Sequence, residues 1–423
     1  LHLKTITKGG HYFLLGFVST NKDKPTSFFK SFKVNDFKYK EEDFTIKKDT
    51  SLYFSVKTNV KPEYVNNFNR AKKDDKDYQG FFRSKTYKSK TNEEIYVQLK
   101  KEHDLVSYAN LDSLSSTLIK REKRNFVTPY FTNSNFEKLN NLTEKSRTYI
   151  ANSSYGKDQN DFNFIKYDIK DSLSSKVVKV KNIISNGAIY ELKTLVDTTY
   201  ATSKFIEEFY KTFVPKDTII GKPLFVSKTA TFFKLLKEKD SIALDGYSSV
   251  NFNKSDTDKL IDVINNGDFD DDQLNIKRYL IRELANNKSD KIDAYLKELY
   301  INSYDNPQYQ IIVFNYFAKQ KTKKSIETLL DLLEVDIPLS NNNFDITNMF
   351  FSLENSLSES KKLYPDFLNY ATITEYKKPI YSLLAKLVEK KMIKPKVYKS
   401  YRKQILNEAK IELKRQLGKK EQE

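Results

Sequence analysis

The feature that most constrains the fold of this chain is a segment near its start that returns, without a gap, 177 residues later. The corresponding residues are Lys4 and Lys181, Ile6 and Ile183, Gly10 and Gly187, Leu15 and Leu192, Phe28 and Phe205, and Phe32 and Phe209. A turn glycine between two apolar runs predicts a β-hairpin, and two phenylalanines four residues apart predict one face of a helix. Retained spacing of this kind is what two copies of one folding unit require.

The repeat predicts a division of the chain into three parts. If residues 178–214 close a domain that starts near residue 36, residues 1–35 are the C-terminal hairpin and helix of a truncated α/β domain. A hairpin with one short helix buries too little apolar surface to be stable alone. We therefore expect residues 36–222 to be a second α/β copy, residues 223–423 to be helical, and the natural protein to extend before Leu1.

Within the second copy, apolar runs of strand length and of helical period alternate with polar segments. The expected strands are 44–45, 52–57, 95–99, 162–169, 177–184 and 188–196, and the expected helices are 111–123 and 203–213. The lysine-rich residues 66–90 and the Asn- and Ser-rich residues 140–161 are interpreted as long surface loops. This order favours an α+β domain, an antiparallel sheet with helices packed on one face.

After residue 222 the pattern is helical almost to the end of the chain. Two helix pairs follow one another at a spacing of 33 residues, namely 274–286 with 291–300 and 309–320 with 324–333. Corresponding residues are Ala285 and Ala318, Ser289 and Thr322, Leu296 and Leu329, and Leu299 and Leu332. Stacked helix pairs of this length predict a HEAT-like α-solenoid. An earlier pair, 235–250 and 257–265, and three long helices, 346–369, 374–391 and 396–417, complete the expected array.

The last of these helices carries an apolar stripe on a basic background. The stripe consists of Tyr398, Tyr401, Ile405, Ala409 and Leu413, with lysines elsewhere. Aromatic and aliphatic residues at helical spacing usually face a core. We therefore interpret the stripe as the inner side of a solenoid cap, in preference to an amphipathic helix that lies on a membrane.

The net charge of +17 is spread along the chain and does not mark one basic surface. It is +11 over residues 1–150, +4 over 151–254, −6 over 255–385 and +8 over 386–423. Nine of the 73 basic residues are arginine, the residue that suits bidentate phosphate and guanine contacts. We expect no specific nucleic-acid binding, and weak binding through the basic tail is the third functional alternative.

The candidate catalytic and metal-binding residues are few. Histidine occurs at positions 2, 11 and 103, and His103, although flanked by two acids, is interpreted as a solvated surface residue rather than a general base. Asp268, Asp270 and Asp272 alternate as in a calcium loop, but Gln273 and Tyr279 stand where that loop needs glycine and glutamate. The start of a helix explains these acids better.

Several classes of site lack their signature in this sequence. The chain has no cysteine, and it carries no phosphate loop or dinucleotide fingerprint. We assign no catalytic, cofactor-binding or metal-binding residue and expect no cofactor. A catalytic pair of carboxylates remains possible, because two such residues need only be close in space and not in sequence.

Three phrases of the sequence carry a family resemblance. They are the run Leu3–Val34, the run Thr194–Tyr200, and Gln320–Lys324 followed by Asp336–Ser340. These resemble the C-terminal, non-catalytic extension of flavobacterial-type TraB/GumN family proteins, and the hairpin endings are similar to those of Mog1/PsbP-like sandwiches. The resemblance implies a protein of the Bacteroidota cell envelope, in the periplasm or at the outer membrane, whose metalloprotease-like domain precedes this segment.

These observations leave three functional hypotheses. The first is a non-catalytic scaffold or protein-interaction region of a larger bacterial envelope protein, with envelope proteins or a membrane-associated complex as partners. The second is an accessory region of an enzyme whose TraB/GumN domain lies upstream of Leu1, and a deep pocket lined by converging carboxylates would favour an enzyme. The third is the weak nucleic-acid binding described above. No stretch is apolar over the roughly 18 residues that a transmembrane helix requires.

Overall fold

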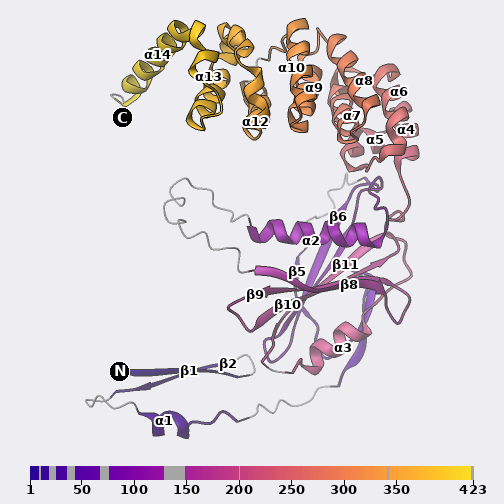
Figure 1. Cartoon of the computed structure of the whole chain (residues 1–423). Coiled ribbons are helices and arrows are strands. Elements are labelled where there is room, and N and C mark those ends of the chain that lie inside the picture. The colour runs from indigo at the N-terminus through magenta and orange to yellow at the C-terminus, as the bar shows by residue number, and fades with distance from the viewer. Residues whose placement is uncertain are drawn as a thin grey trace. The chain divides into compact units, whose positions relative to one another are not determined.

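The computed structural model describes residues 1–8, 11–18, 25–35, 43–66, 76–127, 148–199, 201–340 and 343–420 (Figure 1). Contacts divide the chain into two compact units, Leu1–Asn251 and Phe252–Glu423. Helices α4 (Thr229–Lys237) and α5 (Ser241–Gly246) belong to the first unit, beyond the boundary expected at residue 222. They also replace the single helix expected over residues 235–250, because Asp240 caps a new helix there.

A seven-stranded antiparallel sheet forms the centre of the first unit. Its strands, in spatial order, are β5 (Pro62–Asn66), β6 (Phe81–Lys88), β7 (Glu94–Lys101), β11 (Ala188–Asp197), β10 (Lys176–Ser185), β9 (Asn163–Asp171) and β8 (Thr148–Lys157). The antiparallel sheet predicted from the sequence is therefore confirmed.

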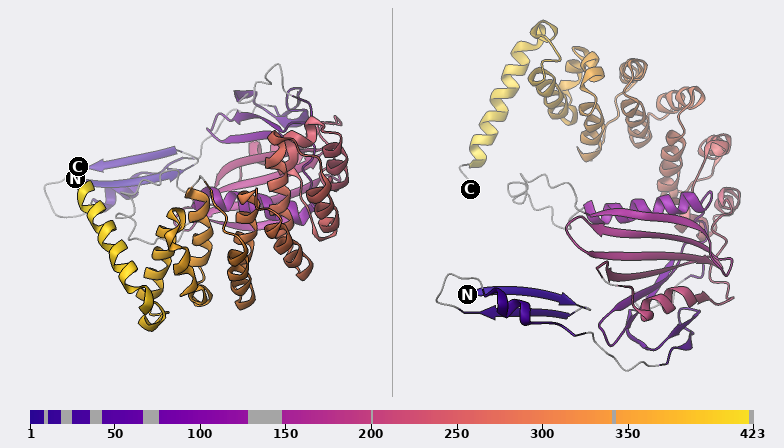
Figure 2. Two further views of the ribbon diagram at one scale, coloured as in Figure 1. Left: turned by 90° about the horizontal axis from the view of Figure 1, so that it is seen from above. Right: turned by 60° about the horizontal axis from the view of Figure 1, so that its bottom comes forward.

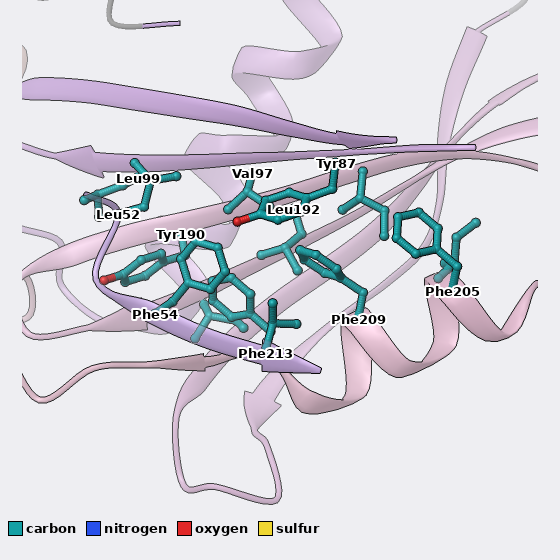
Figure 3. Close-up of a cluster of buried hydrophobic side chains, with 14 of the residues drawn as sticks. Leu52, Phe54, Tyr87, Val97, Leu99, Tyr190, Leu192, Phe205, Phe209 and Phe213 are labelled. Carbon is teal, nitrogen blue, oxygen red and sulfur yellow. The ribbon is translucent and has the colours of Figure 1, made fainter. Parts of the chain in front are cut away.

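Helices pack on both faces of this sheet, which differs from the expected one-sided packing. On one face, Ile183, Tyr190 and Leu192 meet helix α3 (Lys204–Thr212) and the small sheet of β12 (Val214–Pro215), β4 (Phe54–Thr58) and β3 (Thr45–Asp49). Figure 3 shows this core, with Phe205, Phe209 and Phe213 directed toward the strands. On the other face, Leu114 and Leu118 of helix α2 (Leu111–Val127) cover Val180 and Ile189. The central strands are apolar on both sides, so each face needs a cover.

Two strands lie where the sequence indicated loops. Strand β6 falls within residues 66–90 and β8 within residues 140–161. Only Ser84 and Tyr87 of β6 are buried, and β8 is a polar edge strand. The expected apolar alternation is therefore weak in both. Residues 67–75 and 128–147 lie outside the described residues.

The two copies of the hairpin have the same register. Strand β1 (His2–Lys8) pairs with β2 (His11–Phe17) so that Lys8 faces His11, and 177 residues later Ser185 of β10 faces Ala188 of β11. Asn186 and Gly187 both have positive φ, as a tight two-residue hairpin turn requires. Gly10, the expected counterpart of Gly187, lies outside the described residues.

Each hairpin is followed by a helix on the same face. In the first copy, helix α1 (Thr26–Ser31) and the residue after it bring Phe28 to Phe17 and Phe32 to Phe13, with ring centroids 5.1 and 5.9 Å apart. In the second copy, Phe205 and Phe209 of α3 pack on the face that carries Tyr190, the counterpart of Phe13. The sequence repeat therefore corresponds to a repeated hairpin and helix.

The second unit is helical throughout its described residues, as predicted. Its α-helices are α6 (Thr257–Asn266), α7 (Leu274–Asn286), α8 (Asp290–Ile301), α9 (Pro307–Gln320), α10 (Lys323–Val335), α11 (Asn343–Glu354), α12 (Leu357–Ser360), α13 (Thr374–Glu389) and α14 (Arg402–Lys420). Ser289 caps α8 and Thr322 caps α10, each through a side-chain oxygen that accepts a backbone N–H. These caps match the 33-residue correspondence in the sequence.

The long helix expected over residues 346–369 is broken. Helix α11 ends at Glu354, and short turns of 3-10 helix over Lys361–Leu363 and Asp366–Thr372 follow α12. Pro365 lies between these two turns. Proline lacks a backbone donor and disfavours helical conformation in the residue before it, which fits the separation of these two turns; it does not explain the earlier end of α11.

Candidate interaction surfaces

His103 is not the solvated histidine that the sequence indicated. Its Nδ1 accepts the Leu105 N–H (3.2 Å), and its Nε2 is buried without a hydrogen-bond partner among the described residues. The ring meets Tyr78 edge-on and lies against Gly246 of α5. Burial lowers the pKa of His103, an effect that nearby carboxylates oppose. His103 therefore packs between a loop of the sheet and α5.

The ionisable groups around His103 are engaged with one another. Tyr78 and Lys76 both donate to Asp245 of α5, at 2.5 and 3.0 Å. Lys101 is buried and donates to Asp104 (2.8 Å) and to a backbone carbonyl. Hydrogen bonds from Tyr78 and Lys76 lower the pKa of Asp245. This arrangement holds α5 on the sheet.

The remaining histidines and the aspartate cluster lie at structural positions. His2 is half-buried in β1 opposite Phe17, and His11 begins β2. Asp270 is the residue before a turn of 3-10 helix that leads into α7, and Gln273 donates to its carboxylate (3.1 Å). Within the described ranges, no group of three or more acids and histidines could hold a metal ion. The acids lie at the start of the helix, as interpreted, but the Asp270 side chain makes no capping hydrogen bond.

A buried ionic cluster lies beneath α2, and sequence reasoning missed it. Lys193 of β11 contacts Glu122 of α2 (2.9 Å) and Glu191 of its own strand (3.0 Å). Burial works against the charge of Lys193, but the two carboxylates outweigh it and raise its pKa. Arg121 approaches Glu191 from the helix (3.8 Å). Charged residues at alternate positions of an otherwise apolar strand were the available signal.

This cluster brings together two carboxylates, as the pair that the sequence left open requires. The two glutamates are largely buried, and Lys193 lies between them. Lys193 and Arg121 together balance the two carboxylates, and the contact of Lys193 with Glu122 ties α2 to the sheet. Two open cavities of about 450 and 440 Å³ lie elsewhere, one beside Asp293 and Tyr316 and one beside Lys181 and Phe164.

The first copy of the hairpin exposes the face that the second copy buries. Leu3 and Tyr12 are 59% and 65% exposed, whereas their counterparts Val180 and Ile189 are each 2% exposed under α2. A hydrogen bond from Lys176 Nζ to the Tyr12 hydroxyl (2.7 Å) touches this face without covering it. We call Leu3, Tyr12 and Leu14 the open hairpin face, since Leu14 is also 70% exposed.

A second exposed apolar surface lies on α14. The expected core stripe is half-buried at Tyr401 and Ile405 but exposed at Ala409 and Leu413. The interpretation of the whole stripe as core is therefore wrong for its second half. Figures 1 and 2 show α14, in yellow, as the last helix of the second unit. None of the described helices combines the length and apolar character needed to cross a bilayer.

Comparison with known proteins adds no assignment: the chain matches neither a protein-family model nor a curated protein sequence.

Proposed function

We propose that this chain is a non-catalytic scaffold and protein-interaction region of a larger bacterial envelope protein, related to the TraB/GumN proteins that its sequence resembles. The observation that carries the proposal is the open hairpin face. A HEAT-like stacking of the helix pairs in the second unit would provide further surface for envelope partners.

The second copy indicates which kind of partner would bind the open hairpin face. There, α2 places Leu114 and Leu118 on Val180 and Ile189, and β7 and β9 pair with the two outer edges of the hairpin. Within the described residues, β1 and β2 pair only with each other. The partner is therefore an α/β segment with an amphipathic helix for the face and strands for the edges.

Burial of the open hairpin face favours binding. Fully burying one large apolar side chain stabilises a complex or fold by roughly 1.5–3 kcal/mol. Leu3, Tyr12 and Leu14 are 59–70% exposed, so their burial contributes at most about 4–9 kcal/mol. Association itself costs about 4–15 kcal/mol, so a stable complex also requires pairing of the hairpin edges. A role in binding a partner explains why apolar side chains are exposed on the open hairpin face, whereas an isolated hairpin does not explain it.

A cysteine-labelling experiment tests this proposal, because the chain contains no cysteine. Leu14→Cys is compared with Lys234→Cys, an exposed position on α4, in the purified chain and in the protein as it occurs in the envelope of its host. We expect maleimide to modify both positions in the purified chain, but only Cys at position 234 in the envelope. Equal labelling of both positions in the envelope would overturn the proposal.

A further inference from the structure

The exposed half of α14 presents leucines on one narrow face. Leu406, Leu413 and Leu417 are 48%, 57% and 54% exposed. At 3.6 residues per turn, these three positions fall within about 40° of one another around the helix. Their spacing of seven and four residues aligns them along the helix axis, with Lys410 between Leu406 and Leu413. We call these three residues the leucine stripe.

The helix turns a different side toward the rest of the second unit. Tyr401, just before α14, donates to Asn369 (2.5 Å), and Lys377 of α13 donates to Glu408 (3.0 Å). Ideal helix geometry places Glu408 about 160° from the centre of the leucine stripe. The attachment through Glu408 therefore lies on the side away from the stripe, and Leu413 and Leu417 follow it along the helix.

Four cations of α14 lie on the side of the leucine stripe, whereas Arg415 lies opposite it. Arg402, Lys403, Lys410 and Lys414 are all exposed and fall within about 80° of the centre of the stripe. The acids lie on the opposite side, where Glu408 pairs with Lys377 and Glu412 with Arg415 (3.8 Å). The leucine stripe is thus flanked by cations and by no carboxylate of the described part of the helix.

From this arrangement we propose that α14 binds the surface of an anionic phospholipid bilayer, with the leucine stripe in the interfacial layer and the four cations at the headgroups. A bilayer surface offers apolar and anionic groups side by side along the whole helix. Nucleic acid offers the anionic groups but no apolar layer for leucine. Lysine and arginine stems can extend from the apolar layer to the phosphates. The inference does not depend on the partner of the open hairpin face.

Vesicle co-sedimentation of the full chain tests this inference. The vesicles contain phosphatidylcholine alone or an equimolar mixture with phosphatidylglycerol. We expect binding to the anionic vesicles only, weakened by salt because the charges are exposed. Lys410→Gln with Lys414→Gln should weaken binding by about fivefold for each lost cation. Leu413→Gln with Leu417→Gln should weaken it about tenfold or more.

Ile411 provides the matched control. It is 42% exposed on the same helix, but about 140° from the centre of the leucine stripe, so Ile411→Gln should change binding less than about twofold. Equal loss from Ile411→Gln and from the leucine double variant would overturn the proposal. So would binding to single-stranded DNA without binding to anionic vesicles, or a dimer that depends on the leucine stripe in a chain that binds no vesicle. Circular dichroism verifies that each variant keeps its helical content.

Discussion

Replacing Gly246 with alanine tests the packing of His103 against α5. A Cβ at position 246 would lie 2.6 Å from Nε2 and 2.8 Å from Nδ1 of the His103 ring, too close for either group to stay in place. Gly246 has φ −105°, which alanine adopts without strain, and alanine is favoured over glycine in helices by up to about 1 kcal/mol. Without His103 the substitution would therefore be neutral or mildly stabilising.

Overpacking of this kind typically costs about 1–3 kcal/mol. For a unit of this size we expect Gly246→Ala to lower the melting temperature of the first unit by roughly 2–12 °C. Because the chain has no tryptophan, differential scanning calorimetry is a suitable assay. In the His103→Ala background, Gly246→Ala should cost nothing. Gly418→Ala is the control and should not destabilise, because a Cβ added at this exposed position of α14 would meet no described atom within 4 Å. A loss that is equally large without the His103 ring would refute the reasoning.

Three further predictions use the same calorimetric or urea-unfolding measurements. Burial lowers the pKa of His103 in the folded state, so at a pH below 6.5, the ordinary pKa of histidine, the unfolded chain binds more protons than the folded chain. The stability of the first unit should therefore fall as the pH drops below 6.5. This part of the loss should be absent in His103→Gln. Lys193→Met leaves Glu122 and Glu191 buried without their shared cation and should cost about 3–5 kcal/mol, and a change below about 1 kcal/mol would contradict the role assigned to it. Ser289→Ala and Thr322→Ala each remove an N-cap and should each cost about 1 kcal/mol in the second unit, and a clear inequality would count against equivalent roles in the two helix pairs.

The elements that the sequence predicts well are those whose stabilising contacts are local or repeated. Helix α7 has the expected bounds because apolar spacing and flanking polar residues define it within one stretch of chain. The hairpin of β10 and β11 follows from apolar runs around Asn186 and Gly187. Strand β6 was missed because its pairing with β5 and β7, rather than its own composition, makes it a strand.

The ionic cluster, the environment of His103 and the exposed part of α14 could not be predicted, because they depend on contacts between residues that are distant in the sequence. Glu122 and Lys193 are distant along the chain, and only the packing of α2 on the sheet brings them together. The environment of His103 requires α5, whose Gly246 is distant in sequence. The exposure of Leu413 depends on where α13 ends its contact with α14, and a periodic pattern alone cannot distinguish a buried stripe from a free one.

Comparison of the two hairpins also specifies how a cover for the open hairpin face must differ from α2. In the second copy, Glu191 and Lys193 of the covered face need Glu122 and Arg121 of α2 to balance their charges. In the first copy, Leu14 stands at the position of Glu191 and Gly16 at that of Lys193. An acid or arginine above Leu14 would lose solvent without gaining a partner. The helix that covers the open hairpin face must therefore be apolar where α2 is charged, and α2 from a second copy of this chain would be a poor substitute.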